Sequence, residues 1–106
     1  MSDLARTRCM FVASARVELQ IPGSRSLKDK RQVVRSVVER TRARFNASVA
    51  EVEDQDLWDR AVVGIAYVSS SANHAEEVVE KAVTFIRDSF PDSEVLDHQI
   101  DVASPF

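Results

Sequence analysis

The stretch SLKDKRQVVRSVVERTRARF, residues 26–45, predicts an amphipathic helix around which the rest of the chain can be placed. Pro22 and Gly23 are a turn signal before it, and Ser26 with Asp29 has the spacing of a helix N-cap pair. Asn46 stands where the helix must stop and the chain reverse. On a helical wheel the apolar positions fall within about 100° of one another. These positions are Leu27, Val34, Val37, Val38, Thr41 and Phe45. We expect this face to pack against a sheet and to be a main source of stability.

The same helix carries a large excess of positive charge. Residues 25–44 contain eight basic and two acidic side chains, a local charge of +6 in a chain whose net charge is −3. Arg25 precedes the helix, and one edge of the wheel beside the apolar face is lined by Lys28, Arg31, Arg35 and Arg42. These charges fit a solvated surface that pairs with the acidic remainder of the protein. They also fit a contact for nucleic acid or another polyanion.

Length and composition predict one soluble domain. A chain of 106 residues, 44% hydrophobic and 29% charged, can bury a single core. No apolar run approaches the ~20 residues that a membrane span needs, and no signal peptide is visible. Cys9 is the sole cysteine, which suits a reducing cytoplasm. We expect a flexible N-terminus over residues 1–8, a single domain over residues 9–102 and a C-terminal tail over residues 103–106.

Alternation and helical spacing predict the remaining elements. Strict alternation marks a strand over residues 11–21, and short β-branched runs mark strands over residues 45–52 and 61–68. Residues 61–68 are apolar or small on both faces, which favours a central strand. A second helix, capped by Ser71 or Asn73, ends before Pro91, and an edge strand follows at residues 94–102.

This order, β-α-β-β-α-β, predicts an α+β ferredoxin-like fold with one four-stranded antiparallel sheet and two helices on one face. The fold serves many functions, so it does not indicate the activity. One face of the strand at residues 61–68 would take the helices. The other would be covered by a second subunit or left in water.

Residues 51–59, EVEDQDLWD, hold five carboxylates and predict the solvated tip of a hairpin. These carboxylates could also pair with the basic helix of the same or another chain. The spacing of these carboxylates does not match an EF-hand, so we expect no metal site. Trp58 at its base is interpreted as a packing anchor rather than a base-stacking platform. His74 and His98 have no neighbour in sequence that would form a catalytic dyad.

Acylphosphatases are an enzymatic alternative with this topology. They hold an anion with an arginine after the first strand and an asparagine on the second, where this chain has Arg25 and Asn46. The acylphosphatase sequence motifs are absent. RNA-recognition domains of this topology stack bases on sheet aromatics, and the polar face of residues 11–21 offers none.

Two segments, GSRSLKDKR (residues 23–31) and FNASVAEVEDQDLWDRAVVG (residues 45–64), closely resemble the YlxP-like family, the domain-of-unknown-function 503 family of small bacterial domains. The resemblance covers nearly the whole chain after Cys9. It implies a ferredoxin-like fold and a cytoplasmic location. Members are often encoded beside transcription-elongation and translation-initiation factors, which implies a ribosome or RNA association. The resemblance implies no catalytic residue.

The residues and the resemblance together predict a non-enzymatic binding domain, without cofactor or metal, that contacts RNA or a ribosomal particle. The predicted contact residues are Arg25, Lys28, Arg31, Arg35 and Arg42. An alternative is a self-associating interaction module that uses the open sheet face. A third hypothesis is an anion-binding hydrolase like the acylphosphatases.

Overall fold

The structure is a computed structural model that describes residues 9–106. The expected flexible segment, residues 1–8, lies outside the described residues. The elements in chain order are β1 (Phe11–Gln20), α1 (Leu27–Phe45), β2 (Ser48–Glu53), β3 (Arg60–Ser69), α2 (Ala72–Ser89) and β4 (Glu94–Ala103). The helix at residues 26–45 is confirmed to within one residue.

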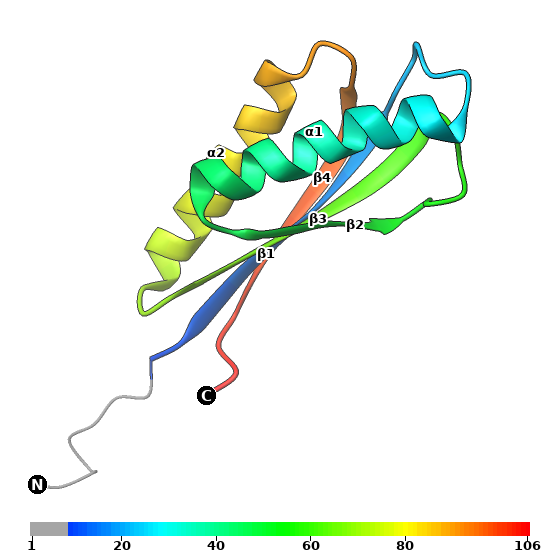
Figure 1. The fold of residues 1–106 in the computed structure, drawn as a ribbon. Coiled ribbons are helices and arrows are strands. Elements are labelled where there is room, and N and C mark those ends of the chain that lie inside the picture. Colours follow the sequence, from blue (N-terminus) through cyan, green and yellow to red (C-terminus); the bar gives the residue numbers. More distant parts are fainter. Residues whose placement is uncertain (1–8) are drawn as a thin grey trace, which may run out of the picture.

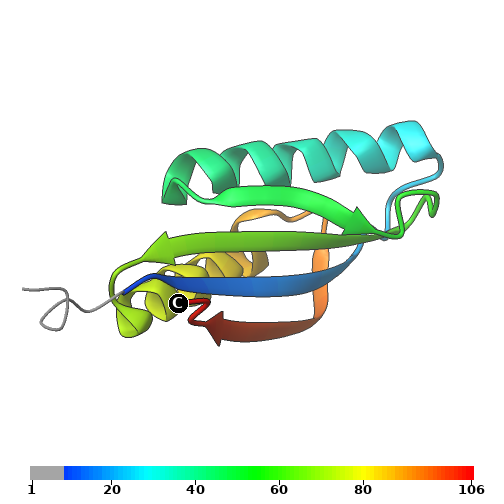
Figure 2. The same ribbon diagram turned by 90° about the horizontal axis from the view of Figure 1, so that it is seen from below.

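The four strands form one antiparallel sheet with the spatial order β2-β3-β1-β4. Both helices lie on the same face of this sheet, and the opposite face is open (Figures 1 and 2). α1 lies over β2 at one edge, and α2 lies over β1 and β4. The predicted ferredoxin-like fold is confirmed, with β1 and β3 central and β2 and β4 at the edges.

The core lies between the sheet and the helices. On β1 the alternate residues Ala13, Ala15, Val17 and Leu19 are buried. They stand opposite Tyr67, Ile65, Val63 and Ala61 of β3, so these two sets share the helix-covered face. α2 adds Ala75, Val79, Ala82, Val83 and Ile86 from its own buried face.

The open face of β3 is also apolar, as its sequence predicts. Val62 is 1% exposed, whereas Val68 is 59% exposed. Gly64 lies under Val52 of β2, and a Cβ at this position would come within 3.0 Å of a Val52 methyl group. β3 therefore has a helix-covered face and a second apolar face, which is exposed at Val68.

The helix ends follow the predicted capping chemistry. The Ser26 hydroxyl accepts from the backbone N–H of Asp29, and Asn46 ends α1 in the left-handed conformation with φ of 52°. Of the two candidate caps for α2, Ser71 is used, and its hydroxyl accepts from the N–H of His74. β4 continues to Ala103, one residue beyond the predicted strand, because Ala103 still pairs with Val12.

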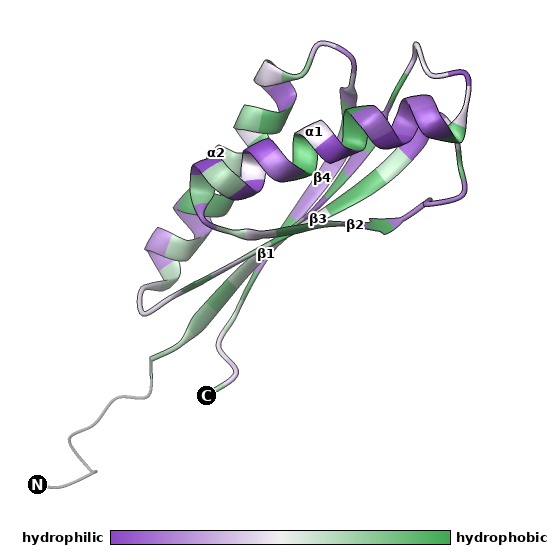
Figure 3. Ribbon diagram, in the orientation of Figure 1, coloured by the Kyte–Doolittle hydropathy of each residue, from purple (hydrophilic) through white to green (hydrophobic). Residues whose placement is uncertain are grey.

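α1 and the central strand β3 differ in polarity. Figure 3 shows α1 as predominantly hydrophilic, with hydrophobic residues at intervals, whereas β3 is largely hydrophobic. Of the predicted apolar face of α1, Val34, Val37 and Thr41 are buried and Phe45 is partly buried. In the part of the chain that the structure describes, no helix is long and apolar enough to cross a membrane.

Candidate nucleic-acid interface

Three of the predicted contact residues form an exposed row on α1. Lys28, Arg31 and Arg35, called the cationic strip below, are exposed on the flank of the helix that turns away from α2. None of the three makes an ion pair or a side-chain hydrogen bond with another of residues 9–106. The strip therefore presents its charge to solvent, as a polyanion contact requires.

The other two predicted contact residues lie at the two ends of the helix. Arg25 is exposed beside the N-cap, and its backbone N–H donates to the Asp29 carboxylate at 3.1 Å. Arg42 is exposed as a residue, but its Nη2 donates to the backbone carbonyl of Val49 at 2.8 Å. Arg42 thus ties α1 to the edge strand β2, which leaves its remaining N–H groups available to another acceptor.

Lys30 is not part of this surface, although the count of positive charges in the sequence includes it. Its side chain is 0% exposed, and Nζ lies 2.8 Å from Oε2 of Glu51. Nζ also lies 2.9 Å from the carbonyl oxygen of Asp54 and 3.2 Å from those of Gln55 and Arg60. The alternative that carboxylates of residues 51–59 pair with the basic helix is confirmed for Glu51 and Lys30. The solvated position predicted for Glu51 is wrong, because its carboxylate contacts a buried ammonium group.

Helical geometry explains the position of Lys30. It lies four residues before Val34 and therefore points in the same direction, toward the sheet. The hairpin that joins β2 to β3 returns the chain to this point and offers a carboxylate and three carbonyl groups. The sequence signal was present, since Lys30 continues the spacing of the apolar face and residues 51–59 offer carboxylates, but the sequence did not show which basic side chain meets which carboxylate.

The flank of α1 that faces α2 carries two further arginines with a different role. The Arg40 guanidinium lies 4.6 Å from the centre of the Phe90 ring, and that of Arg44 lies 4.9 Å from the Phe85 ring. Both distances suit cation–π packing between the helices. Their charge is therefore directed toward aromatic faces of the protein rather than along the cationic strip.

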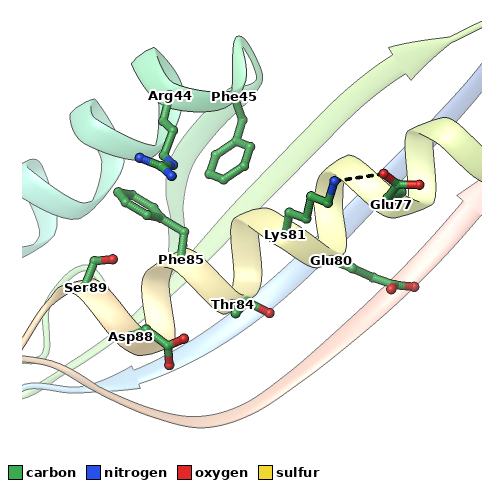
Figure 4. A pocket seen from close by; sticks show the side chains of 9 residues that line it. All are labelled: Arg44, Phe45, Glu77, Glu80, Lys81, Thr84, Phe85, Asp88 and Ser89. Atoms are coloured by element: carbon green, nitrogen blue, oxygen red, sulfur yellow. Dashed lines mark hydrogen bonds and ion pairs between the residues drawn. The ribbon is translucent and has the colours of Figure 1, made fainter.

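A groove of about 520 Å³ lies between the end of α1 and α2. Figure 4 shows Arg44 beside the rings of Phe45 and Phe85, and Lys81 paired with Glu77 at 2.9 Å. Glu80 and Asp88 also line it. The mixture of both charges gives this groove no preference for phosphate.

The loop before α1 and the turn before β3 are joined directly. The Ser24 hydroxyl donates to the backbone carbonyl of Trp58, and the N–H of Ile21 donates to the carbonyl of Asp59 at 2.8 Å. Although its backbone is fixed, Trp58 is 50% exposed. The prediction that Trp58 is a packing anchor was therefore wrong for its side chain.

The geometry does not assemble the acylphosphatase-like pair. Arg25 precedes α1 and Asn46 follows it, so the two residues lie at opposite ends of a helix of 19 residues, or about 28 Å apart along its axis. Near Arg25, a cavity of about 230 Å³ is lined by Asp29 and Asp92. Carboxylates at this position disfavour a bound anion.

Residues 9–106 contain no group of three His, Cys, Asp or Glu side chains placed to hold a metal ion. His74 packs edge-on against Tyr67, with ring centres 5.8 Å apart. His98 Nδ1 lies 3.3 Å from Nη2 of Arg87 on the surface. His74 thus has a packing contact and His98 a surface position.

The open face of the sheet carries an exposed ion pair instead of aromatic side chains. Arg16 on β1 contacts Glu53 at 2.8 Å and Glu18 at 3.4 Å. The hydrogen bond from Arg16 is the main reason why the pKa of Glu53 is lowered from its ordinary value of 4.5. The same hydrogen bond raises the pKa of Arg16.

Comparison with known proteins identifies the family. A solved structure, "De novo designed protein Foldit4", is similar with a TM-score of 0.55 and 13% identity, over 92% of this chain and 99% of that one, which shows the fold alone. "Uncharacterized protein YlxP" of Bacillus subtilis (strain 168) is 40% identical over 84 residues, which are 79% of this chain and 90% of the relative. The family model described as "Protein of unknown function (DUF503)" matches residues 12–100. The chain therefore belongs to the DUF503 family.

Proposed function

We propose that this protein is a cytoplasmic binding domain that contacts the phosphates of RNA through the cationic strip. The observation that carries the proposal is that Lys28, Arg31 and Arg35 are exposed together and have no ion-pair partner among residues 9–106. A solvated helix that served only solubility would gain from pairing these charges with the abundant carboxylates of the chain. The implied association of the family with RNA or the ribosome supports the same conclusion.

The spacing along α1 suits a nucleic-acid backbone. Lys28 and Arg35 are separated by about 10 Å along the axis, at ~1.5 Å per residue, with Arg31 between them. Two of the three are arginines, whose planar guanidinium groups bind phosphate oxygens in pairs. Such contacts hold a backbone in place and read little sequence.

The negative charge of the rest of the protein restricts where a polyanion can bind. Outside residues 25–44 the chain has six basic and fifteen acidic side chains. This excess repels phosphates from most of the surface and favours encounters in which α1 faces the nucleic acid. We therefore expect affinity to depend on the strip rather than on net charge.

Salt dependence tests the proposal. Binding of a labelled single-stranded RNA is measured at several salt concentrations by fluorescence anisotropy. Three neutralised phosphates predict a slope of about −2 in a plot of log K against log [salt], and further contacts by Arg25 and Arg42 make it steeper, to about −3.5. A slope near zero contradicts the proposal.

Charge reversal locates the contact. The double variant R31E/R35E should weaken RNA binding by at least about 10-fold, because it replaces two phosphate contacts by two repulsive charges. The matched control K81E/R87E makes the same change in net charge on exposed residues of α2. Equal losses in both variants would show that net charge alone decides binding and would exclude the strip as the site.

A specific observation favours a second candidate function, self-association through the open sheet face. Val52 and Val68 are 48% and 59% exposed there. They belong to an apolar band on β2 and β3 that comprises Ala50, Val52, Gly64, Ala66 and Val68. Sedimentation velocity at micromolar concentration tests this function: a concentration-dependent dimer that Val68→Asp abolishes supports it, and a strict monomer excludes it.

A further inference from the structure

We propose that the indole of Trp58 is a stacking platform for one base of a single-stranded RNA whose phosphates lie along the cationic strip. The inference rests on the proposed function and adds that the RNA is single-stranded, because only an unpaired base can stack on the ring. It goes beyond phosphate contact, which would serve single and double strands alike.

The backbone that carries Trp58 is held rigidly. Its own carbonyl accepts from Ser24, and the carbonyl of Asp59 accepts from Ile21. Three more carbonyl groups, those of Asp54, Gln55 and Arg60, surround the buried Nζ of Lys30. A turn fixed at both ends needs little ordering when a ligand binds, which favours its use as a binding surface.

The indole is exposed although its backbone is fixed. Half of the Trp58 residue is accessible to solvent, and the neighbouring Leu57 is 45% exposed. A tryptophan that served only the core would be covered more completely, since its large apolar area is the reason for burying it. A half-exposed tryptophan on a rigid turn offers ring surface on which an unpaired base can stack.

The turn lies beside the positively charged end of α1. Ser24 contacts Trp58 and directly precedes Arg25 in the chain, and Ser26 then begins the helix that bears Lys28. Figures 1 and 2 both show the turn between β2 and β3 at the end of the molecule where α1 begins. An RNA strand whose phosphates follow the cationic strip toward this end therefore approaches the turn that carries Trp58.

The turn also carries carboxylates, which limit how the strand can lie. Asp54 and Asp56 are exposed, and neither makes an ion pair with another of residues 9–106. They repel phosphates, so only the uncharged base is accommodated over the turn while the backbone stays on α1. The variant D54N/D56N should consequently bind RNA more tightly than the natural protein.

Trp58 provides its own probe, because it is the sole tryptophan of the chain. Indole fluorescence is followed while the full-length protein is titrated with an oligouridylate of about ten nucleotides, within the usual site size of a single domain. A matched oligomer keeps every phosphate but lacks the bases. We expect the oligouridylate to quench the fluorescence and to bind about 10-fold more tightly than the abasic oligomer.

Variants separate the stacking proposal from the phosphate proposal. Trp58→Ala should remove the preference for oligouridylate over the abasic oligomer, Trp58→Phe should keep part of it, and R31E/R35E should weaken both ligands. The stacking proposal is overturned if the natural protein shows no quenching and Trp58→Ala binds both oligomers as the natural protein does. If R31E/R35E then still loses both oligomers, the result supports phosphate contact alone. If neither oligomer binds the natural protein, both proposals are overturned. A concentration-dependent change in fluorescence without RNA would mean that a second copy covers the indole, which also overturns stacking.

Discussion

Lys30 and Arg31 are neighbours in the sequence, yet they belong to two different regions of the molecule. Lys30 is completely buried and has an acidic partner, 2.8 Å away, and three carbonyl groups around its ammonium. Arg31 is exposed with Lys28 and Arg35 and has no ion-pair partner among residues 9–106. The difference shows that one basic helix can serve stability on one side and remain available for a ligand on another. Identical charge in the sequence therefore says little about role.

The largest effect on stability is expected from removing the buried charge of Lys30. Lys30→Met leaves Glu51 and three carbonyl groups without their donor, which should lower the free energy of unfolding by about 3–5 kcal/mol. The same substitution two residues earlier, Lys28→Met, is the control and should change stability by less than about 0.5 kcal/mol. Urea denaturation measures both. Equal effects of the two substitutions would remove the distinction between the regions.

A second buried polar group on α1 sharpens the comparison. Thr41 is 0% exposed, and its Oγ1 has no hydrogen-bond partner among residues 9–106. Thr41→Val keeps the shape and removes the unsatisfied hydroxyl, so it should raise the free energy of unfolding by about 1 kcal/mol. Thr84→Val, at an exposed position on α2, is the control. A loss of stability in Thr41→Val would mean that the hydroxyl has a partner in solution.

A smaller and pH-dependent effect is expected from the exposed ion pair. The pKa of Glu53 is lowered below 4.5 in the folded state, chiefly by the hydrogen bond from Arg16. Its contribution to stability is therefore present above pH 4.5 and is lost as the pH falls through the lower, folded-state value. Glu53→Gln should be slightly less stable than the natural protein at neutral pH and equally stable in acid. Urea denaturation at both pH values measures the difference, and Glu80→Gln, the same change of charge at an exposed position of α2, is the control.

The smallest effect on stability is expected from the cationic strip. R31E/R35E removes no contact that the structure contains, so the free energy of unfolding should stay within about 0.5 kcal/mol of the natural value. Thermal unfolding followed by circular dichroism checks this. A large loss would show that the two arginines support the fold, and their effect on RNA binding would then need a different explanation.

The elements were predictable because local rules decide them. Alternation of apolar residues identified β1, and the caps Ser26 and Asn46 placed the ends of α1 to within a residue. The predicted second strand began three residues too early, because β2 starts at Ser48. The two other errors, the solvated position of Glu51 and the covered side chain of Trp58, concern the hairpin of β2 and β3 and its contacts with the start of α1. Such contacts join segments more than twenty positions apart, and neither propensity nor periodicity carries information over that separation.

The amino-acid sequence alone determined the order of helices and strands, the alternation of the strand at residues 11–21 and the excess of positive charge on α1, because these depend on the types of neighbouring residues. Only the tertiary structure decided which of those charges meet a partner and whether Trp58 is covered. The physical reason is that pairing and exposure depend on what the fold brings opposite a side chain. In this protein Glu51 of β2 neutralises Lys30, and the cationic strip has no ion-pair partner among the described residues.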